Sequence, residues 1–156
     1  EKDGEKSGLS TEWYENGGKK IEGTYKDGEK VGLWTRWYDI PWMFNQQKKS
    51  EIDYKDGKKY GLGTHWYKSG QKKQEGILKD GKADGLVTAW YENGEKRFEG
   101  TFKDTIVDGW LTEYYDNGQK RFTGIFKDGE IINLIGQWNE DGSLEQSMET
   151  IMRGTK

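Results

Sequence analysis

Residues 8–17 read GLSTEWYENG, and this pattern recurs along the chain. Related stretches read GLWTRWY, GLGTHWYKSG, GLVTAWYENG and GWLTEYYDNG, and a degenerate copy reads NLIGQW. The copies begin at Gly8, Gly32, Gly61, Gly85, Gly109 and Asn133. Every step between copies is 24 residues except the one from Gly32 to Gly61, which is 29. A fixed period in this range predicts a linear array in which one supersecondary unit stacks on its neighbours.

The composition indicates a thin folded object rather than a disordered chain. Only 31% of the residues are apolar and 34% are charged, but the 8 Trp, 9 Tyr and 5 Phe recur in register. A few large aromatic side chains are therefore expected to bury most of the area. The net charge of −3 comes from interspersed charges of both signs. This pattern lacks the basic stripe of a nucleic-acid interface or of an anionic-membrane anchor.

The chain contains no cysteine, which excludes disulfides and thiolate metal sites and is compatible with an extracellular or a cytosolic location. No apolar run is long enough to span a membrane, and no signal peptide is evident. The chain begins without Met and inside a repeat, because KDGEK at 2–6 matches KDGEK at 26–30. We therefore expect that an upstream segment was removed. A secreted or cell-surface location in a bacterium is expected in preference to the cytoplasm.

Each repeat reads as a β-hairpin. Two strand-like runs, 9–14 and 19–25, are joined by Glu-Asn-Gly at 15–17 and followed by Lys-Asp-Gly at 26–28. A three-residue loop ending in a left-handed glycine is predicted at 15–17, and the turn at 26–28 is expected to have the same parity. This parity places one apolar set on one face: Leu9, Thr11, Trp13, Ile21, Gly23 and Tyr25. The other face carries a variable residue, a polar residue and Tyr.

Glycine recurs inside the second run, at Gly23, Gly76, Gly100 and Gly124. A strand glycine weakens a sheet unless a neighbour needs the space. The predicted register places the Trp13 indole over Gly23. The alternative is a β-bulge without such packing.

The predicted fold class is all-β, an elongated single-layer antiparallel meander of tandem 24-residue hairpins with about a dozen strands. The repeat array is assigned to residues 1–142, and residues 143–156 are assigned to a C-terminal cap or tail. Leu144, Met148, Ile151 and Met152 have helical spacing, but the tail is also compatible with a final strand. Either structure would cap an open sheet edge.

Residues 22–33, EGTYKDGEKVGL, resemble the MORN repeat (membrane occupation and recognition nexus). The Trp-Tyr-Glu-Asn-Gly segment that follows is similar to the bacterial variant found in YwqK-family antitoxins. The resemblance extends from about Lys2 to Gly142. It implies a sheet array without catalytic residues, and it implies binding roles: protein partners, dimerisation, lipid tethering in eukaryotic members and toxin neutralisation in the bacterial variant.

Signatures of catalysis are missing from the sequence. His65 is the only histidine, and a single His without Cys makes neither a zinc site nor a nucleophile–base pair. Most Asp residues stand in Asp-Gly turns, and no spacing matches an EF-hand or a phosphate loop. We therefore predict a protein that is not an enzyme and has no cofactor and no metal.

One segment breaks the repeat. Residues 39–47 replace a tight turn and contain the only proline together with Trp42, Met43 and Phe44. Loops on rigid scaffolds often carry recognition, and aromatic anchors dominate interface energetics. The equally weighted alternative is that the loop folds back and covers Trp37 or Trp66.

These observations predict a protein-binding repeat module of the antitoxin, immunity or surface-interaction type. A one-layer sheet leaves an apolar face partly open, and such patches mark contacts. The partner is expected to be a toxin, a surface protein or a second copy of the chain in a homodimer. Candidate contact residues are Trp34, Tyr38, Trp42, Met43, Phe44, His65, Tyr67 and Tyr91. The alternative is carbohydrate binding through the aromatic face, with lipid third and no nucleic acid expected.

Overall fold

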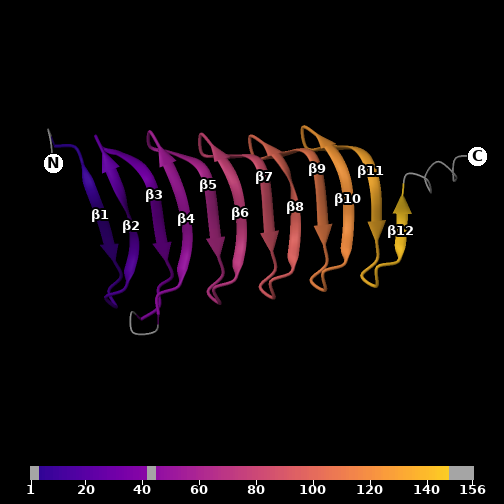
Figure 1. Ribbon diagram of the computed structural model, residues 1–156, viewed down its shortest axis with the longest axis horizontal. Coiled ribbons are helices and arrows are strands. Elements are labelled where there is room, and N and C mark those ends of the chain that lie inside the picture. The colour runs from indigo at the N-terminus through magenta and orange to yellow at the C-terminus, as the bar shows by residue number, and fades with distance from the viewer. Residues whose placement is uncertain (1–3, 42–44, 148–156) are drawn as a thin grey trace, which may run out of the picture. The chain divides into compact units, whose positions relative to one another are not determined.

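The computed structural model describes residues 4–41 and 45–147 and is all-β in this part (Figure 1). Twelve strands follow one another: β1 Gly8–Trp13, β2 Lys19–Lys26, β3 Glu29–Trp37, β4 Lys48–Lys55, β5 Lys58–Trp66, β6 Lys72–Lys79, β7 Lys82–Trp90, β8 Lys96–Lys103, β9 Ile106–Tyr114, β10 Lys120–Lys127, β11 Glu130–Trp138 and β12 Leu144–Ser147. The described residues include no helix, and so none with the length and hydropathy needed to cross a membrane.

The chain divides into two compact units, one reaching Lys82 and one starting at Ala83. In each unit the strands form a single antiparallel layer and are arranged in chain order. The predicted all-β antiparallel meander of hairpins is therefore confirmed. Leu144–Ser147 pairs with β11 as a strand, and the rest of the predicted tail lies outside the described residues.

The Glu-Asn-Gly turn adopts the predicted three-residue loop. The backbone N–H of Tyr14 donates to the carbonyl of Gly18 at 2.8 Å, and that of Gly17 donates to the carbonyl of Tyr14 at 3.0 Å. Gly17 has φ of 82°, a left-handed conformation that glycine adopts without steric cost. The Asn16 side chain accepts the N–H of Gly18 at 2.8 Å, which closes the turn.

The Lys-Asp-Gly turn differs from the prediction, since its loop has two residues rather than three. Asp27 and Gly28 have φ of 49° and 78°, and Lys26 pairs directly with Glu29. Two successive left-handed residues form a type I′ turn, whose twist matches that of the strands, and Asp tolerates the first position. The consequence is that Tyr25 pairs with Lys30.

A β-bulge in each hairpin changes the predicted register. Glu12 pairs with Ile21 while Trp13 pairs with Lys19, so Lys20 has no partner across the strand. An extra residue moves every following side chain to the opposite face. The same irregularity leaves one cationic residue unpaired in later hairpins: Lys49, Lys73, Arg97 and Arg121.

The bulge divides the apolar residues between two faces, so the prediction of a single common face was wrong. The leucine face carries Leu9, Thr11 and Trp13 and the equivalent residues of later copies. The core face carries Ile21, Gly23 and Tyr25, which the prediction had placed with the leucines. The buried apolar side chains are all on the core face: Ile21, Trp34 and Ile52 in the first unit, and Val87, Ala89 and Leu111 in the second.

Gly23 is covered by Trp34 rather than by Trp13, because Trp13 projects from the opposite face. A Cβ at Gly23 would lie 2.2 Å from Cδ2 of Trp34. In the next copy the sizes are exchanged: Ile52 stands at the glycine position and pairs with Gly63, which stands at the tryptophan position. Each copy therefore fills this site with one large and one small residue, as close packing requires.

Side-chain hydrogen bonds tie each copy to the next. In each of these bonds the tyrosine that follows the first strand of a copy donates a hydrogen bond from its hydroxyl. The acceptor is the backbone carbonyl of the last residue of the first strand in the next copy. The pairs are Tyr14 to Trp37 at 2.9 Å, Tyr38 to Trp66 at 2.7 Å, Tyr91 to Tyr114 at 2.9 Å and Tyr115 to Trp138 at 3.0 Å. These bonds fix the position of successive turns in each unit.

Candidate functional site

Trp34 belongs to the core. Its side chain is 4% exposed, and its ring meets Tyr25 edge-on at a centroid distance of 4.9 Å. The Lys30 ammonium lies 4.1 Å from the Trp34 ring centroid and covers the solvent side. Trp34 therefore supports the surface above it and has little area of its own for a partner to contact.

The predicted tyrosines hold the repeats together. Tyr38 and Tyr91 are half-buried, and their hydroxyls are engaged by carbonyls of the following copy. Tyr67 occupies the equivalent place, and the Lys73 ammonium lies 5.4 Å from its ring centroid. These side chains stabilise the array, and cations cover part of their rings.

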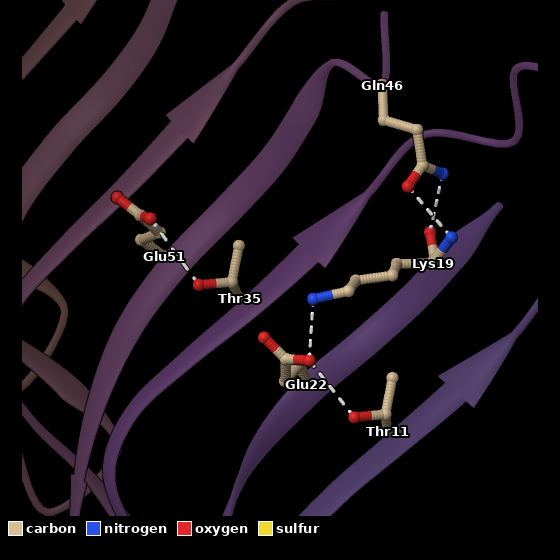
Figure 2. A network of polar contacts seen from close by, with 6 residues as sticks. All are labelled: Thr11, Lys19, Glu22, Thr35, Gln46 and Glu51. Atoms are coloured by element: carbon tan, nitrogen blue, oxygen red, sulfur yellow. Dashed lines mark hydrogen bonds and ion pairs between the residues drawn. The ribbon is translucent and has the colours of Figure 1, made fainter. Parts of the chain in front are cut away.

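The inserted loop is anchored at both of its described ends. Gln46 accepts the N–H of Lys19 at 2.8 Å and donates to the Lys19 carbonyl at 3.0 Å, as Figure 2 shows. The Asp39 carboxylate accepts the Asn16 amide at 2.6 Å. The three apolar residues on which the loop prediction depends, Trp42, Met43 and Phe44, lie outside the described residues.

The leucine face presents an open apolar row in the first unit. Leu9 is 74% exposed, Leu33 is 52% exposed and Leu62 is 47% exposed. Trp13 and Ile77 of the same face are 57% and 41% exposed. In the second unit the equivalent positions, Leu86 and Trp110, are also exposed. The sequence predicts a partly open apolar face that includes Leu9 and Trp13, but none of these exposed residues is among the predicted contact residues.

A polar row runs beside the leucines. The Glu22 carboxylate accepts the Thr11 hydroxyl at 3.0 Å and the Lys19 ammonium at 2.7 Å (Figure 2). Glu51 accepts the Thr35 hydroxyl in the same way. The hydrogen bond from Lys19 is the main cause that holds the pKa of Glu22 below its ordinary value. In the first four copies a hydrogen-bonded carboxylate therefore stands next to an exposed leucine, and in the fifth copy Thr123 takes this position and hydrogen-bonds to Thr112.

Cations gather on the core face of the first unit. A hollow of about 360 Å³ lies over Trp34, and its charged lining consists of Glu12, Lys20, Lys30, Arg36 and Lys49. His65, on the same face, keeps an exposed edge. Partial burial of the ring is the main cause that lowers the pKa of His65. Nearby positive charges lower this pKa further, and they belong to Lys59, Lys73, Arg36 and Lys49. Alternation alone places Lys30, Trp34 and Arg36 on one face, but the predicted register put Glu22 there as well, and the bulge moves that carboxylate to the opposite face.

Among the described residues, no three His, Cys, Asp or Glu side chains meet in a group that could hold a metal ion. The described side chains therefore offer contact surfaces, one apolar and one cationic.

Two segments of the chain match a known repeat family. The family model described as the MORN repeat variant matches residues 6–27 and 83–104. Each match covers one hairpin, the one formed by β1 and β2 in the first case and the one formed by β7 and β8 in the second. No curated protein matches the chain. Repeats of this family are commonly non-catalytic modules that bind proteins or membranes.

Proposed function

Because the chain carries MORN repeat variants, we propose that it is a non-catalytic module that binds a protein partner through its leucine face. The observation that carries the proposal is the row of Leu9, Leu33 and Leu62, each about half exposed or more. Exposed apolar rows of this kind usually mark contact surfaces. Burying them returns about 25 cal/mol for each Å² removed from water.

The polar row completes the pattern of a protein interface. Thr–Glu–Lys hydrogen bonds beside each leucine give an apolar centre with a polar rim whose groups are already satisfied. A partner can therefore bury apolar surface here without removing water from unpaired charged groups. The rigid sheet presents this row with little ordering cost.

The same row argues against the other two ligand classes. On the leucine face Glu22, Glu51 and Glu75 are each paired with a lysine, so these groups give no excess positive charge to attract an anionic membrane. Sugar stacking needs a continuous row of exposed aromatic planes, whereas Trp13 and Tyr60 of this face alternate with the aliphatic side chains of Leu9, Leu33 and Leu62. A protein partner, including a second copy of the chain, fits both features. That the partner is a toxin stays a prediction.

Photo-crosslinking in the cells that express the chain tests the proposal. A benzophenone amino acid replaces Leu33 in one variant and Ser69, in an exposed turn outside the leucine face and the cationic cluster, in a control. We expect a discrete protein adduct from position 33 only, lost when Leu62→Ser is added. Sedimentation velocity of the purified chain shows whether the partner is a second copy.

Two results would overturn the proposal. One is an adduct pattern that is the same for both positions. The other is glycan-array retention or liposome sedimentation that Leu62→Ser abolishes, since the leucine face would then serve a sugar or a membrane.

A further inference from the structure

The core face of the first unit gathers positive charge in a chain whose net charge is −3. The strand register places Lys30 opposite Tyr25, Lys59 opposite Tyr54 and Arg36 opposite Ile21. The bulged residues Lys49 and Lys73 line hollows on this face. We call the set Lys30, Arg36, Lys49, Lys59 and Lys73 the cationic face.

Little negative charge balances these residues. Among the described residues that line the two hollows, Glu12 is the one carboxylate. It lies near Lys20, at 3.7 Å, at one end of the cluster. The charges of Arg36 and Lys59 contribute to lowering the pKa of Lys30, after burial of its own ammonium group. The cations thus stand close enough to repel one another.

The second unit shows that the fold does not require the cations at Lys30 and Lys59, whereas the bulged position stays cationic there as Arg97 and Arg121. The positions that Lys30 and Lys59 occupy are filled there by Val107 and Ile131. Their cross-strand neighbours change from tyrosine to Phe102 and Phe126. The same hairpin therefore forms with an apolar residue at this place. Mutual repulsion works against folding, so a positive cluster that the fold does not need indicates a binding role.

We propose that the cationic face binds an acidic protein segment, a run of Asp and Glu residues lying across the strands. Arg36 can bind one carboxylate with two hydrogen bonds, and the lysines supply point charges along the run. An acidic run needs no apolar pocket, which fits a face whose large ring, Trp34, is 4% exposed.

The other polyanions fit less well. Binding of single-stranded nucleic acid uses exposed aromatic rings as stacking platforms, and Trp34 is covered by Lys30. Membrane attachment combines charge with inserted apolar groups. The exposed apolar side chains of this unit project from the leucine face instead: Leu9, Trp13, Leu33, Tyr60, Leu62 and Ile77.

Fluorescence anisotropy with a labelled decaglutamate peptide tests the proposal on the full chain. We expect saturable binding that weakens as salt is raised, and no binding of the matching decaglutamine peptide. The variant Lys30→Val/Lys59→Val copies a residue that the second unit already accommodates. It is expected to weaken binding about tenfold, the loss of two charge contacts near a partly desolvated surface.

The control variant Lys26→Val/Lys79→Val makes the same change in net charge at exposed residues outside the cationic face. It should leave the affinity within about twofold of the parent chain, as distant exposed charges are screened. Circular dichroism shows whether both variants fold. If either does not, Arg36→Gln is the substitute variant, and it should also weaken decaglutamate binding.

Equal weakening by both double variants would show that only net charge matters and would overturn the proposal. Tighter binding of phosphatidylserine vesicles or a thymidine oligonucleotide than of decaglutamate would overturn the choice of an acidic segment. Leu33→Ser, which tests the leucine face, should leave decaglutamate binding unchanged. The two proposals therefore fail separately.

Discussion

Exchanging the sizes of two residues tests the packing between neighbouring strands in the first unit. Gly23 does not have a left-handed φ, so glycine is needed there for space and not for backbone conformation. Its missing side chain makes room for Trp34, whose Cδ2 lies 2.2 Å from where a Cβ would stand. Gly23→Ile alone forces the indole out of place and should cost about 2–3 kcal/mol of unfolding free energy.

Trp34→Gly alone removes a side chain that is 4% exposed. Loss of a buried tryptophan costs about 3–5 kcal/mol, and a glycine inside a strand adds roughly 1 kcal/mol. If the two changes were independent, the double variant would lose about 6–9 kcal/mol. The double variant reproduces the Ile52 and Gly63 arrangement of the next copy, however. We expect it to recover about 2 kcal/mol of that sum, because the new isoleucine fills part of the space that the indole leaves.

The assay is urea unfolding followed by far-ultraviolet circular dichroism for the parent chain, both single variants and the double variant. Thr24→Ile, at an exposed neighbouring position, is the control and should change stability by less than about 0.5 kcal/mol. A double variant whose loss equals the sum of the single losses would refute the size exchange.

Three further predictions concern the tie between copies, a strained turn and a buried hydroxyl. Tyr38→Phe removes a 2.7 Å hydrogen bond and should lower the unfolding free energy by about 1 kcal/mol. Tyr60→Phe, at a residue that is 49% exposed, is the control and should change the unfolding free energy little. Thermal unfolding of the two variants and the parent chain measures both effects. Thr105 has φ of 74° where the other Asp turns have glycine, so Thr105→Gly should stabilise the chain by about 1 kcal/mol and Gly129→Thr should destabilise it, as read from urea midpoints. Burial, followed by the hydrogen bond to Glu99, raises the pKa of Tyr114 from the ordinary 10.0 to about 12. The protonated hydroxyl therefore contributes fully to stability below pH 10, and this contribution is lost as the pH rises to 12. Unfolding free energies measured across this range should decline less in Tyr114→Phe, and an identical decline would contradict the assignment.

Features set by local chain geometry could be predicted from the sequence. The Glu-Asn-Gly loop needs a left-handed glycine at its last position, and Gly17 supplies it. Side chains alternate along a strand, so Leu9, Thr11 and Trp13 had to share a face whatever their partners were. The open apolar row followed from this alternation. The Asp-Gly signal for a two-residue turn was also present in the sequence, but we assigned it the parity of the other turn.

Features set by pairing between strands could not be predicted. A bulged residue needs no particular side chain, and Lys20 looks like any exposed lysine in the sequence. Missing that bulge moved Ile21 to the wrong face and paired Gly23 with the wrong indole. It also hid the cationic face, because the predicted register placed Glu22 among Lys30, Arg36 and Lys59, and the true register moves Glu22 to the leucine face.

The tyrosine ties have a consequence for how such a chain changes over evolutionary time. The hydrogen bond between successive copies always joins the same two groups, a tyrosine hydroxyl and a backbone carbonyl. Unequal recombination that adds or deletes one complete 24-residue unit therefore re-forms this hydrogen bond at the junction. The longer second copy shows this tolerance within one gene product: Tyr38 still reaches Trp66 across five additional residues, 29 in place of 24. The area offered to a partner is therefore a heritable quantity that duplication adjusts in whole steps.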